Sequence, residues 1–482
     1  MLYPPQRPRA ARLPFAAAAC ARGRGALRAV HASGWAALAS LVAGCATVDA
    51  TPDYAAVAVD IRAATGADTV YQPGTEEVST ARVEALLGAP LSLEGAVEVA
   101  LLNNPGLKAA FRRVGVARAD LEQAGMWTNP SLMLALRFPS AGGSTDIEGN
   151  LLGNLLDLWL RAPRIDGADA ALRQQMSEVA LRGAALAGAV RTAYAEAVAT
   201  ERIVVIAAEN RDTAMQLLAL TEERFAAQAA LATDVQLARL DVAATEVSVQ
   251  DAQFAALAAR QVLANHLGLE ALRADQRFST DLLPSGSPLL PAARLHELAG
   301  GARFDLEAAS HALRAAEAEL QVQRGRVSRV LRGGVAGEKE GEWAVGPAVQ
   351  VEIPVFDQNQ AQIARAAAIV TERTEILAGL RLAAGRDVEI ARARVEAMRE
   401  TARLYADDVL VTAQQALELA RASYRVGKST LLPVLEAQRT LLSARRELVV
   451  RQREVAKALS DLEVATGLPR EHLFESDPKR PS

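Results

Sequence analysis

Apolar residues recur at two different spacings along this chain, and the change of spacing marks out its elements. Over most of the sequence they follow the three-to-four-residue spacing of amphipathic helices. In two short stretches, residues 132–138 and 349–355, they alternate with other residues, which predicts strands with one apolar face. Each strand has a less regular partner, expected over residues 150–160 and 327–339, and Gly333-Gly334 should break the latter.

A very long helix is expected after each of these strand pairs. Residues 168–228 contain no proline and only two glycines, so they could form a helix about 90 Å long. The chain then returns over residues 233–266, and the same arrangement recurs over 360–426 and 431–466. In the last segment two adjacent apolar rows repeat every seven residues, which is typical of a coiled coil and wide enough to face two neighbouring helices. The rows contain Leu435, Leu442 and Val449, beside Leu441, Leu448, Val455 and Leu462.

The two halves of this pattern are copies of each other. When the chain is shifted by 199 positions, two long stretches match without a gap. The matched pairs include Leu107 with Leu306, Leu121 with Leu320, Phe225 with Tyr424, Val235 with Val434 and Gly268 with Gly467. A repeat of this length is too long for a solenoid unit, so the sequence predicts a duplicated half-protein. The fold class expected is mainly α with a small β part.

The strands are close to the length that a tilted membrane-spanning β-strand needs. Four strands cannot close a barrel, and open edges cannot lie in lipid, because each unpaired backbone group costs several kcal/mol there. If the hairpins are in a membrane, several chains must share one barrel. Trp127, Trp159 and Trp343 border the hairpins, which suits either an interfacial aromatic belt or filling of the core.

Composition and charge exclude several other classes. The net charge is −4, from 53 basic and 57 acidic residues, so no basic surface for nucleic acid is expected. Aromatic residues make up 4% of the chain, which suits close-packed helices. Past the N-terminal segment, the few histidines (His266, His296, His311 and His472) form no metal-ligand spacing, and no nucleophile elbow or phosphate-binding glycine loop is found. No enzyme, cofactor or metal site is therefore expected.

The N-terminus has the layout of a targeting segment. Six arginines precede an apolar stretch over residues 29–43, as in a secretory signal peptide. Val42-Ala43-Gly44-Cys45 resembles a bacterial lipobox, which would place cleavage before Cys45 and a lipid on its sulfur. The alternative is a plain signal peptide with an incidental cysteine. Ala46, in place of an aspartate, resembles an outer-membrane sorting signal.

Several segments in this order resemble the TolC-type outer-membrane efflux family, and the resemblance covers residues from about 91 to 468. Leu91-Ser92-Leu93-Glu94-Gly95-Ala96 through Asn103-Asn104-Pro105 resembles the family's opening helix and its break. Tyr424-Arg425-Val426-Gly427 through Leu435-Glu436-Ala437-Gln438 resembles the turn at the far end of the second helical pair, and Phe225 through Gln236 the equivalent first turn. Ile353-Pro354-Val355-Phe356-Asp357 resembles the strand that leaves the membrane barrel.

The resemblance implies a homotrimer with a shared twelve-stranded β-barrel in the outer membrane and a long α-helical barrel in the periplasm. It implies passive conduction of substrate handed over by an inner-membrane pump and a periplasmic adaptor. The lipobox, by itself, predicts a lipid anchor in the outer membrane. The domains expected are a signal peptide (1–44), an N-terminal lipid-anchored segment (45–90), a first repeat (91–269, with its hairpin at about 131–160), a connector (270–302), a second repeat (303–468, with its hairpin at about 327–355) and a tail (469–482).

The two helix turns carry the site residues that the resemblance implies. The adaptor-docking positions are Phe225, Val235, Tyr424, Gly427 and Val434. Asp234 and Glu436 would each form a three-fold ring of carboxylates at the periplasmic gate, or else belong to a solvated helix face. The chain departs from the family pattern at Pro433, where an aspartate is common, and at Gln228, where a glycine is usual.

Two rival functions and the cargo depend on other features. A periplasmic adaptor has one helical hairpin, and a coiled-coil scaffold needs no alternating strands, whereas this chain is expected to have two hairpins and both strand pairs. Phe356-Asp357-Gln358-Asn359-Gln360 resembles the barrel exit of heavy-metal efflux members, but the chain has no His-rich or Met-rich tract. The cargo is therefore left open between metal cations and drugs or other small molecules.

Overall fold

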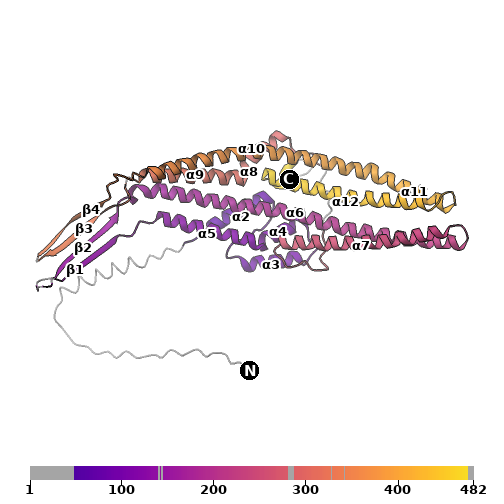
Figure 1. The fold of residues 1–482 in the computed structure, drawn as a ribbon, viewed down its shortest axis with the longest axis horizontal. Coiled ribbons are helices and arrows are strands. Elements are labelled where there is room, and N and C mark those ends of the chain that lie inside the picture. Colours follow the sequence, from indigo (N-terminus) through magenta and orange to yellow (C-terminus); the bar gives the residue numbers. More distant parts are fainter. Residues whose placement is uncertain are drawn as a thin grey trace, which may run out of the picture. The chain divides into compact units, whose positions relative to one another are not determined.

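The structure, a computed structural model, describes residues 48–475 apart from 139, 141, 143–144, 280–286, 327 and 341. The described residues from Asp49 onward form one compact unit. Within it the long helices run side by side, and a four-stranded sheet lies at one end of them (Figure 1). In the described part of the chain no helix combines the length and the apolar character needed to cross a bilayer.

The first repeat opens with the helix break that the sequence predicts. The Ser92 hydroxyl caps α4 (Leu93–Asn103) by accepting the Gly95 N–H at 2.9 Å, and the Asn104 side chain caps α5 (Pro105–Gly125) in the same way. Pro105 begins α5, where its missing N–H costs nothing. The elements that follow are β1 (Ser131–Arg137), β2 (Asp146–Asn154), α6 (Asp157–Ala226) and α7 (Ala232–His266).

The second repeat has the same order of elements. It consists of α8 (Ala292–Ala302), α9 (Phe304–Gly325), β3 (Leu331–Glu340), β4 (Glu342–Val351), α10 (Gln360–Leu404), a π-helical turn (Tyr405–Val409), α11 (Leu410–Arg425) and α12 (Leu432–Thr466). Adding 199 to the bounds of α4 gives the bounds of α8. The duplication therefore includes a helix that was expected to be part of a loose connector.

Equivalent contacts in the two repeats confirm the duplication in three dimensions. Gly268 and Gly467 follow the returning helices with φ of 71° and 70°. A Cβ at Gly268 would lie 2.8 Å from the Asn103 carbonyl oxygen, and a Cβ at Gly467 would lie 2.6 Å from the Ala302 carbonyl oxygen. Only glycine allows the backbone to approach so closely with this φ. Beside them, Asn104 donates to the carbonyl of His266, and its equivalent Arg303 donates to that of Ala465.

The sheet has the antiparallel order β1-β2-β3-β4, so β1 and β4 each have one unpaired edge. Its register places an almost continuous apolar set on one face, because side chains alternate along each strand. This apolar face carries Leu132, Leu134, Leu136, Leu151, Val335, Trp343, Val345, Val349 and Val351. The opposite face carries Arg137, Glu148, Asn150, Arg332, Glu338 and Gln350.

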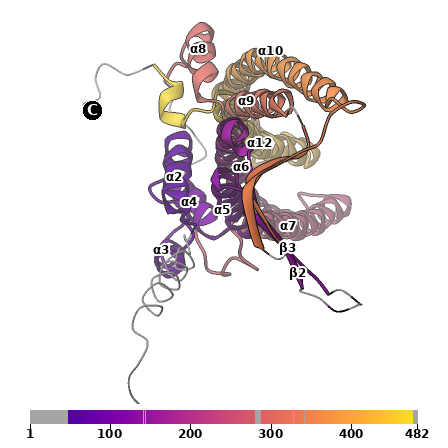
Figure 2. The same cartoon turned by 90° about the vertical axis from the view of Figure 1, so that its left-hand side faces the viewer.

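The helices form a curved layer with shorter elements on its outer side. Seen along the long helices, α2 (Thr51–Thr65), α4 and α8 lie outside the layer made by α6, α9, α10 and α12 (Figure 2). In this layer α12 packs against α6 on one side and against α10 and α11 on the other. The expectation that the returning helix of the second repeat faces two neighbours is confirmed.

Several expected boundaries are wrong. The partner strand expected over 150–160 occupies Asp146–Asn154. It ends there because α6 starts at Asp157, whose carboxylate accepts the Thr128 N–H at 2.8 Å and pairs with Arg164. Gly333-Gly334 does not break β3. Instead, a Cβ at Gly334 would lie 1.9 Å from the Leu151 carbonyl oxygen, so the glycine lets β2 approach.

One further strand is displaced, and some elements were not expected at all. The strand expected over 349–355 runs over Glu342–Val351, so Pro354 lies outside it. The N-terminal helices α2 and α3 (Glu76–Leu87) were missed, as was the π-helical turn between α10 and α11. α2 packs on α5 and α6, with Arg118 and Asp53 forming a pair of 2.6 Å hydrogen bonds between α5 and α2.

Candidate functional site at the helix tips

Each long helical pair ends in a turn. The turn and its flanking residues are here called the first tip (residues 224–232) and the second tip (residues 423–432). At the first tip Gln228 adopts a left-handed φ of 57°. Its N–H donates to the Phe225 carbonyl at 2.9 Å, and the Ala229 N–H donates to that of Arg224 at 2.7 Å. These two bonds form a Schellman motif, which satisfies carbonyls at the end of α6. Gln228 thus takes a conformation that glycine adopts more easily.

The second tip repeats this geometry 199 residues later. Gly427 has a φ of 72°, its N–H donates to the Tyr424 carbonyl at 3.0 Å, and the Lys428 N–H donates to that of Ser423 at 2.9 Å. A Cβ at Gly427 would meet only the Arg224 Nη2, at 3.9 Å. The position therefore requires glycine for its backbone conformation and has space for a side chain.

The helices that leave the tips start in two different ways. The Asp234 carboxylate accepts the Leu231 N–H at 3.1 Å while its own N–H donates to the Leu231 carbonyl, so Asp234 caps α7. Pro433 lies in the first turn of α12, where a backbone donor is not needed. The departure from the family pattern at Pro433 is thus compatible with the start of the helix.

Three of the five expected docking residues are buried within the chain. Val235, Tyr424 and Val434 are buried, the last two in a cluster that contains Leu417, Leu431 and Leu435. Phe225 remains 47% exposed, and Gly427 is an exposed backbone position. The apolar side chains that the tips present to solvent are Phe225, Leu231, Val426 and Leu432.

Arg224 links the two tips and was not expected from the sequence. Its Nη1 donates to the Tyr424 carbonyl at 2.6 Å and to the Arg425 carbonyl at 3.3 Å, and its Nη2 donates to the Ala229 carbonyl at 3.0 Å. Its guanidinium lies 4.4 Å from the centre of the Tyr424 ring, as in a cation–π contact. One arginine of the first tip thus satisfies carbonyls at the end of α11. A basic residue in the last turn of α6 was the available signal, although it could not reveal a partner in the other repeat.

The two gate candidates have different surroundings. Asp234 is partly buried and engaged in its cap, whereas Glu436 is exposed. No ion pair reaches the Glu436 carboxylate from the residues that the structure describes. Asp241 lies about two helical turns further along α7 and is buried. Its Oδ1 lies 3.5 Å from the Arg439 Nη2 of α12, so this carboxylate joins the two helical pairs. Cys45, the expected lipidation site, lies outside the described residues.

Two rows of apolar residues are left uncovered on the outermost helices. On α7 Leu240, Val247 and Phe254 recur every seven residues and are 64%, 61% and 74% exposed. On α10 and α11 Ile376, Ile390, Leu404 and Val411 are separated by multiples of seven and are also exposed. Both rows lie away from the buried faces of their helices, which include Val249 and Ala256 on α7 and Val388 and Val395 on α10. A spacing of seven suits packing of these helices in a coiled coil.

Comparison with known proteins identifies relatives that cover most of the chain. Residues 295–468 match the family described as Outer membrane efflux protein. The chain is 27% identical over 365 residues to the cobalt-zinc-cadmium resistance protein CzcC of Cupriavidus metallidurans, covering 74% of this chain and 85% of CzcC. It is also 27% identical over 401 residues to the pyoverdine export outer membrane protein OpmQ of Pseudomonas putida, covering 73% of this chain and 80% of OpmQ.

The fold is similar to that of solved outer-membrane channels. The structure of the outer-membrane channel OprN superimposes with a TM-score of 0.66 over 85% of this chain and 96% of OprN, at 21% sequence identity. The outer membrane protein VceC of Vibrio cholerae gives a TM-score of 0.65 over 78% of this chain and 96% of VceC, at 20% identity.

Proposed function

The chain belongs to the outer membrane efflux protein family, and we infer from this that it is the outer-membrane channel of a tripartite efflux pump. Such a channel carries out no chemical reaction. It provides a continuous path across the periplasm and the outer membrane for cargo that a pump delivers. The observation in this chain that supports the role best is a sheet with one apolar and one polar face at the end of very long helices.

We propose that three copies assemble into the working channel. The free edges of β1 and β4 cannot remain unpaired in lipid, because no water is there to satisfy them. Pairing β4 of one copy with β1 of the next would give twelve strands from three four-stranded sheets. The apolar face would then contact lipid, and the face with Arg137, Glu148 and Glu338 would line the interior.

The exposed rows of the helices support the same assembly. α7 lies at one margin of the helical layer, and α10 with α11 lies at the other. If three copies close into a tube, the row of Leu240, Val247 and Phe254 meets the row of Ile390, Leu404 and Val411 of the next copy. Both rows would be buried at a seven-residue spacing, which suits left-handed packing.

The tips are the proposed contact with the periplasmic adaptor. Phe225, Leu231, Val426 and Leu432 offer apolar side chains there, and Gly427 shapes the turn that presents two of them. Val235, Tyr424 and Val434 support this surface from below. The Arg224 contacts with the Tyr424 and Arg425 carbonyls make the two tips of one chain a single unit for docking.

The gate role is proposed for Glu436 and Asp234 in the trimer. Three copies would place two rings of carboxylates near the tips, and such rings favour cations over anions. Asp234→Asn together with Glu436→Gln should leave the trimer intact, because asparagine can also cap α7. In planar bilayers under a KCl gradient, wild-type channels should conduct with a cation preference and the double variant should lose it. An unchanged reversal potential would make both acids ordinary solvated residues, and the absence of any wild-type conductance would contradict the channel itself.

The lipid anchor rests on the lipobox alone. Mass spectrometry of the mature N-terminus should find a diacylglyceryl or triacylglyceryl group on Cys45. The Cys45→Ser variant should lack this mass and still insert, because the barrel would hold it in the membrane. A mature chain that begins elsewhere, or an unmodified Cys45, would exclude the anchor.

Metal cations are the proposed cargo. CzcC is named for cobalt-zinc-cadmium resistance and OpmQ for pyoverdine export, so relatives differ in what they carry. The segment Phe356-Asp357-Gln358-Asn359-Gln360, which resembles the barrel exit of heavy-metal efflux members, favours metal cations here. A deletion strain should therefore lose tolerance to zinc, cobalt or cadmium and regain it with the wild-type gene. Loss of tolerance to organic drugs alone would reassign the cargo.

A further inference from the structure

A large cavity lies beside α8, and none of the residues that line it belongs to the tips or to the sheet. It has a volume of about 870 Å³ and is bordered by α8, α9 and α10, with Arg173 contributed by α6. Leu306, Leu377 and Ala384 provide an apolar part of its lining. α8, which borders the cavity, lies outside the layer of long helices (Figure 2).

The lining of this cavity is strongly basic. Arg173, Arg303, Arg314 and Arg381 all line it, whereas Glu307 is the only carboxylate that does so among the described residues. Four arginines from three helices and the α8–α9 junction therefore face one carboxylate. A surface with this balance attracts anions.

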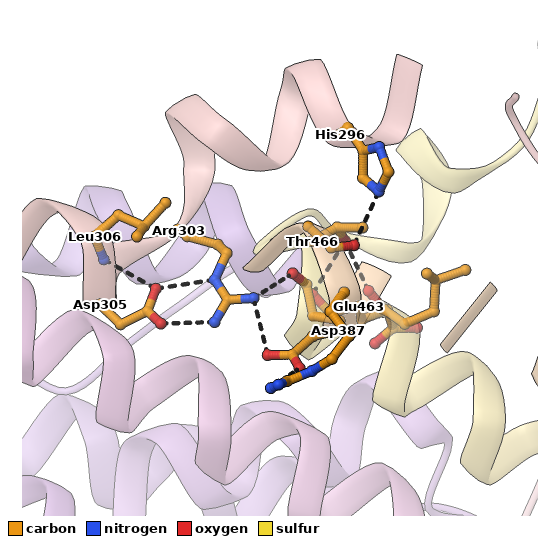
Figure 3. Close-up of polar contacts among 11 residues, drawn as sticks. His296, Arg303, Asp305, Leu306, Asp387, Glu463 and Thr466 are labelled. Atoms are coloured by element: carbon orange, nitrogen blue, oxygen red, sulfur yellow. Dashed lines mark hydrogen bonds and ion pairs between the residues drawn. The ribbon is translucent and has the colours of Figure 1, made fainter. Parts of the chain in front are cut away.

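Two of the four arginines are already neutralised. Arg303 binds Asp305 through hydrogen bonds of 3.0 and 2.6 Å and lies 3.6 Å from Asp387 (Figure 3). Arg173 donates to Asp169 at 2.8 Å. Within the described part of the chain, Arg314 and Arg381 have neither a hydrogen bond nor an ion pair from their guanidinium groups. Their donors are available to a ligand.

A buried histidine at the same cavity adds a second, independent observation. His311 is only 8% exposed, and its Nδ1 has no hydrogen-bond partner. Its Nε2 lies 3.7 Å from the Glu307 carboxylate. Burial lowers the pKa of His311, and the positive charges of Arg314 and Arg173 act in the same direction, against the opposite effect of Glu307. A buried polar atom that lacks a partner is uncommon in a folded protein.

Three glycines keep space open around these groups. Gly300 and Gly301 near the end of α8 and Gly385 on α10 all line the cavity. A Cβ built at any of them would meet no atom within 4 Å. The glycines are therefore not required by packing within the chain, and they leave room for a bound molecule.

We propose that this cavity binds a small anion that carries phosphate or carboxylate groups. The planar guanidinium groups of Arg314 and Arg381 suit the paired oxygens of such groups. His311 lines the same cavity beside these arginines. None of the residues that line the cavity belongs to the tips or to the sheet, so anion binding is a property additional to the proposed channel function.

The test uses the purified full-length trimer in detergent and two probes, inorganic phosphate and citrate. Isothermal titration calorimetry at matched ionic strength should show saturable binding of at least one probe and none of chloride. Arg314→Gln and Arg381→Gln should each weaken binding about tenfold or more, because each removes charge-assisted hydrogen bonds. Gly301→Leu should abolish binding by filling the cavity without changing the charge.

Arg365→Gln is the matched control, since Arg365 is an exposed arginine on α10 that does not line the cavity. It should bind the probe as the wild type does. Equal binding in all variants, or no saturable binding in the wild type, would overturn the proposal. Loss of the trimer in native mass spectra of Arg314→Gln or Arg381→Gln would also overturn it, because the cavity would then be a contact between copies of the chain.

Discussion

Replacing Phe254 with glutamate should leave each chain folded and prevent three chains from assembling. Phe254 is 74% exposed in the single chain, so the substitution removes almost no packing within it. In the proposed trimer the same position is buried against the next copy. A charged group buried there without a partner costs several kcal/mol, and the loss recurs at each of the three equivalent interfaces. Native mass spectrometry in detergent should show monomers, with a helical circular dichroism spectrum like that of the wild type.

Two further variants make this test specific. Leu404→Glu places the charge in the opposing row on α10 and should have the same effect. Gln253→Glu adds the same charge one residue away, outside the row of Leu240, Val247 and Phe254, and should remain trimeric. A trimeric Phe254→Glu protein would show that α7 does not meet a neighbouring copy through this row. Monomers from Gln253→Glu as well would point to a general effect of charge on α7.

The features that the sequence predicts correctly depend on local signals or on the internal repeat. Pro105 interrupts a helix wherever it occurs, and the Asn104 side chain caps the helix that follows. The absence of proline between residues 168 and 228 permits the long α6, although the helix begins earlier, at Asp157. The constant shift of 199 residues predicts equivalent glycines at 268 and 467, and both adopt the same left-handed conformation.

The features that were missed depend on contacts between distant residues. α8 contains Gly300 and Gly301, which lower helix propensity, and it is stabilised by packing against α10 and α12. Gly334 was expected to break its strand, whereas in the structure it lets Leu151 of the neighbouring strand approach. Arg224 contacts carbonyls 200 and 201 positions away, at Tyr424 and Arg425. No local pattern in the sequence indicates such a contact.

The five residues expected to dock the adaptor show how much a family resemblance can predict. It led to five positions near the tips, and all five lie at or beside these turns. It could not distinguish side chains that face solvent from side chains that support the turn. Burial separates Phe225 from Val235, Tyr424 and Val434, so a change at one of the latter should act on stability before it acts on docking.

Replacing Gly427 with valine should abolish efflux while the trimer and the barrel survive. Gly427 has a φ of 72°, a conformation that costs a β-branched residue roughly 1–2 kcal/mol or more. The strain should shift the N–H groups of residues 427 and 428, which close the Schellman motif, and the neighbouring carbonyls that Arg224 holds. The exposed Val426 and Leu432 would then move relative to Phe225 and Leu231. The sheet lies at the opposite end of the helices, so membrane insertion should be unaffected (Figure 1).

The matched controls separate backbone strain from the size of the side chain. A side chain at residue 427 has space, because its Cβ would lie 3.9 Å from the Arg224 Nη2. Gly427→Asn should therefore retain most efflux, since asparagine tolerates left-handed φ far better than valine. Gln228→Gly, at the equivalent position of the first tip, should raise the stability of that turn by up to about 1 kcal/mol and keep transport. Efflux assays and adaptor pull-downs on the three variants distinguish an effect of backbone strain from an effect of side-chain size. If Gly427→Val transports and binds the adaptor normally, the second tip has no role in docking. If Gly427→Asn fails as completely as Gly427→Val, the space around residue 427 matters to the partner more than the conformation of the turn does.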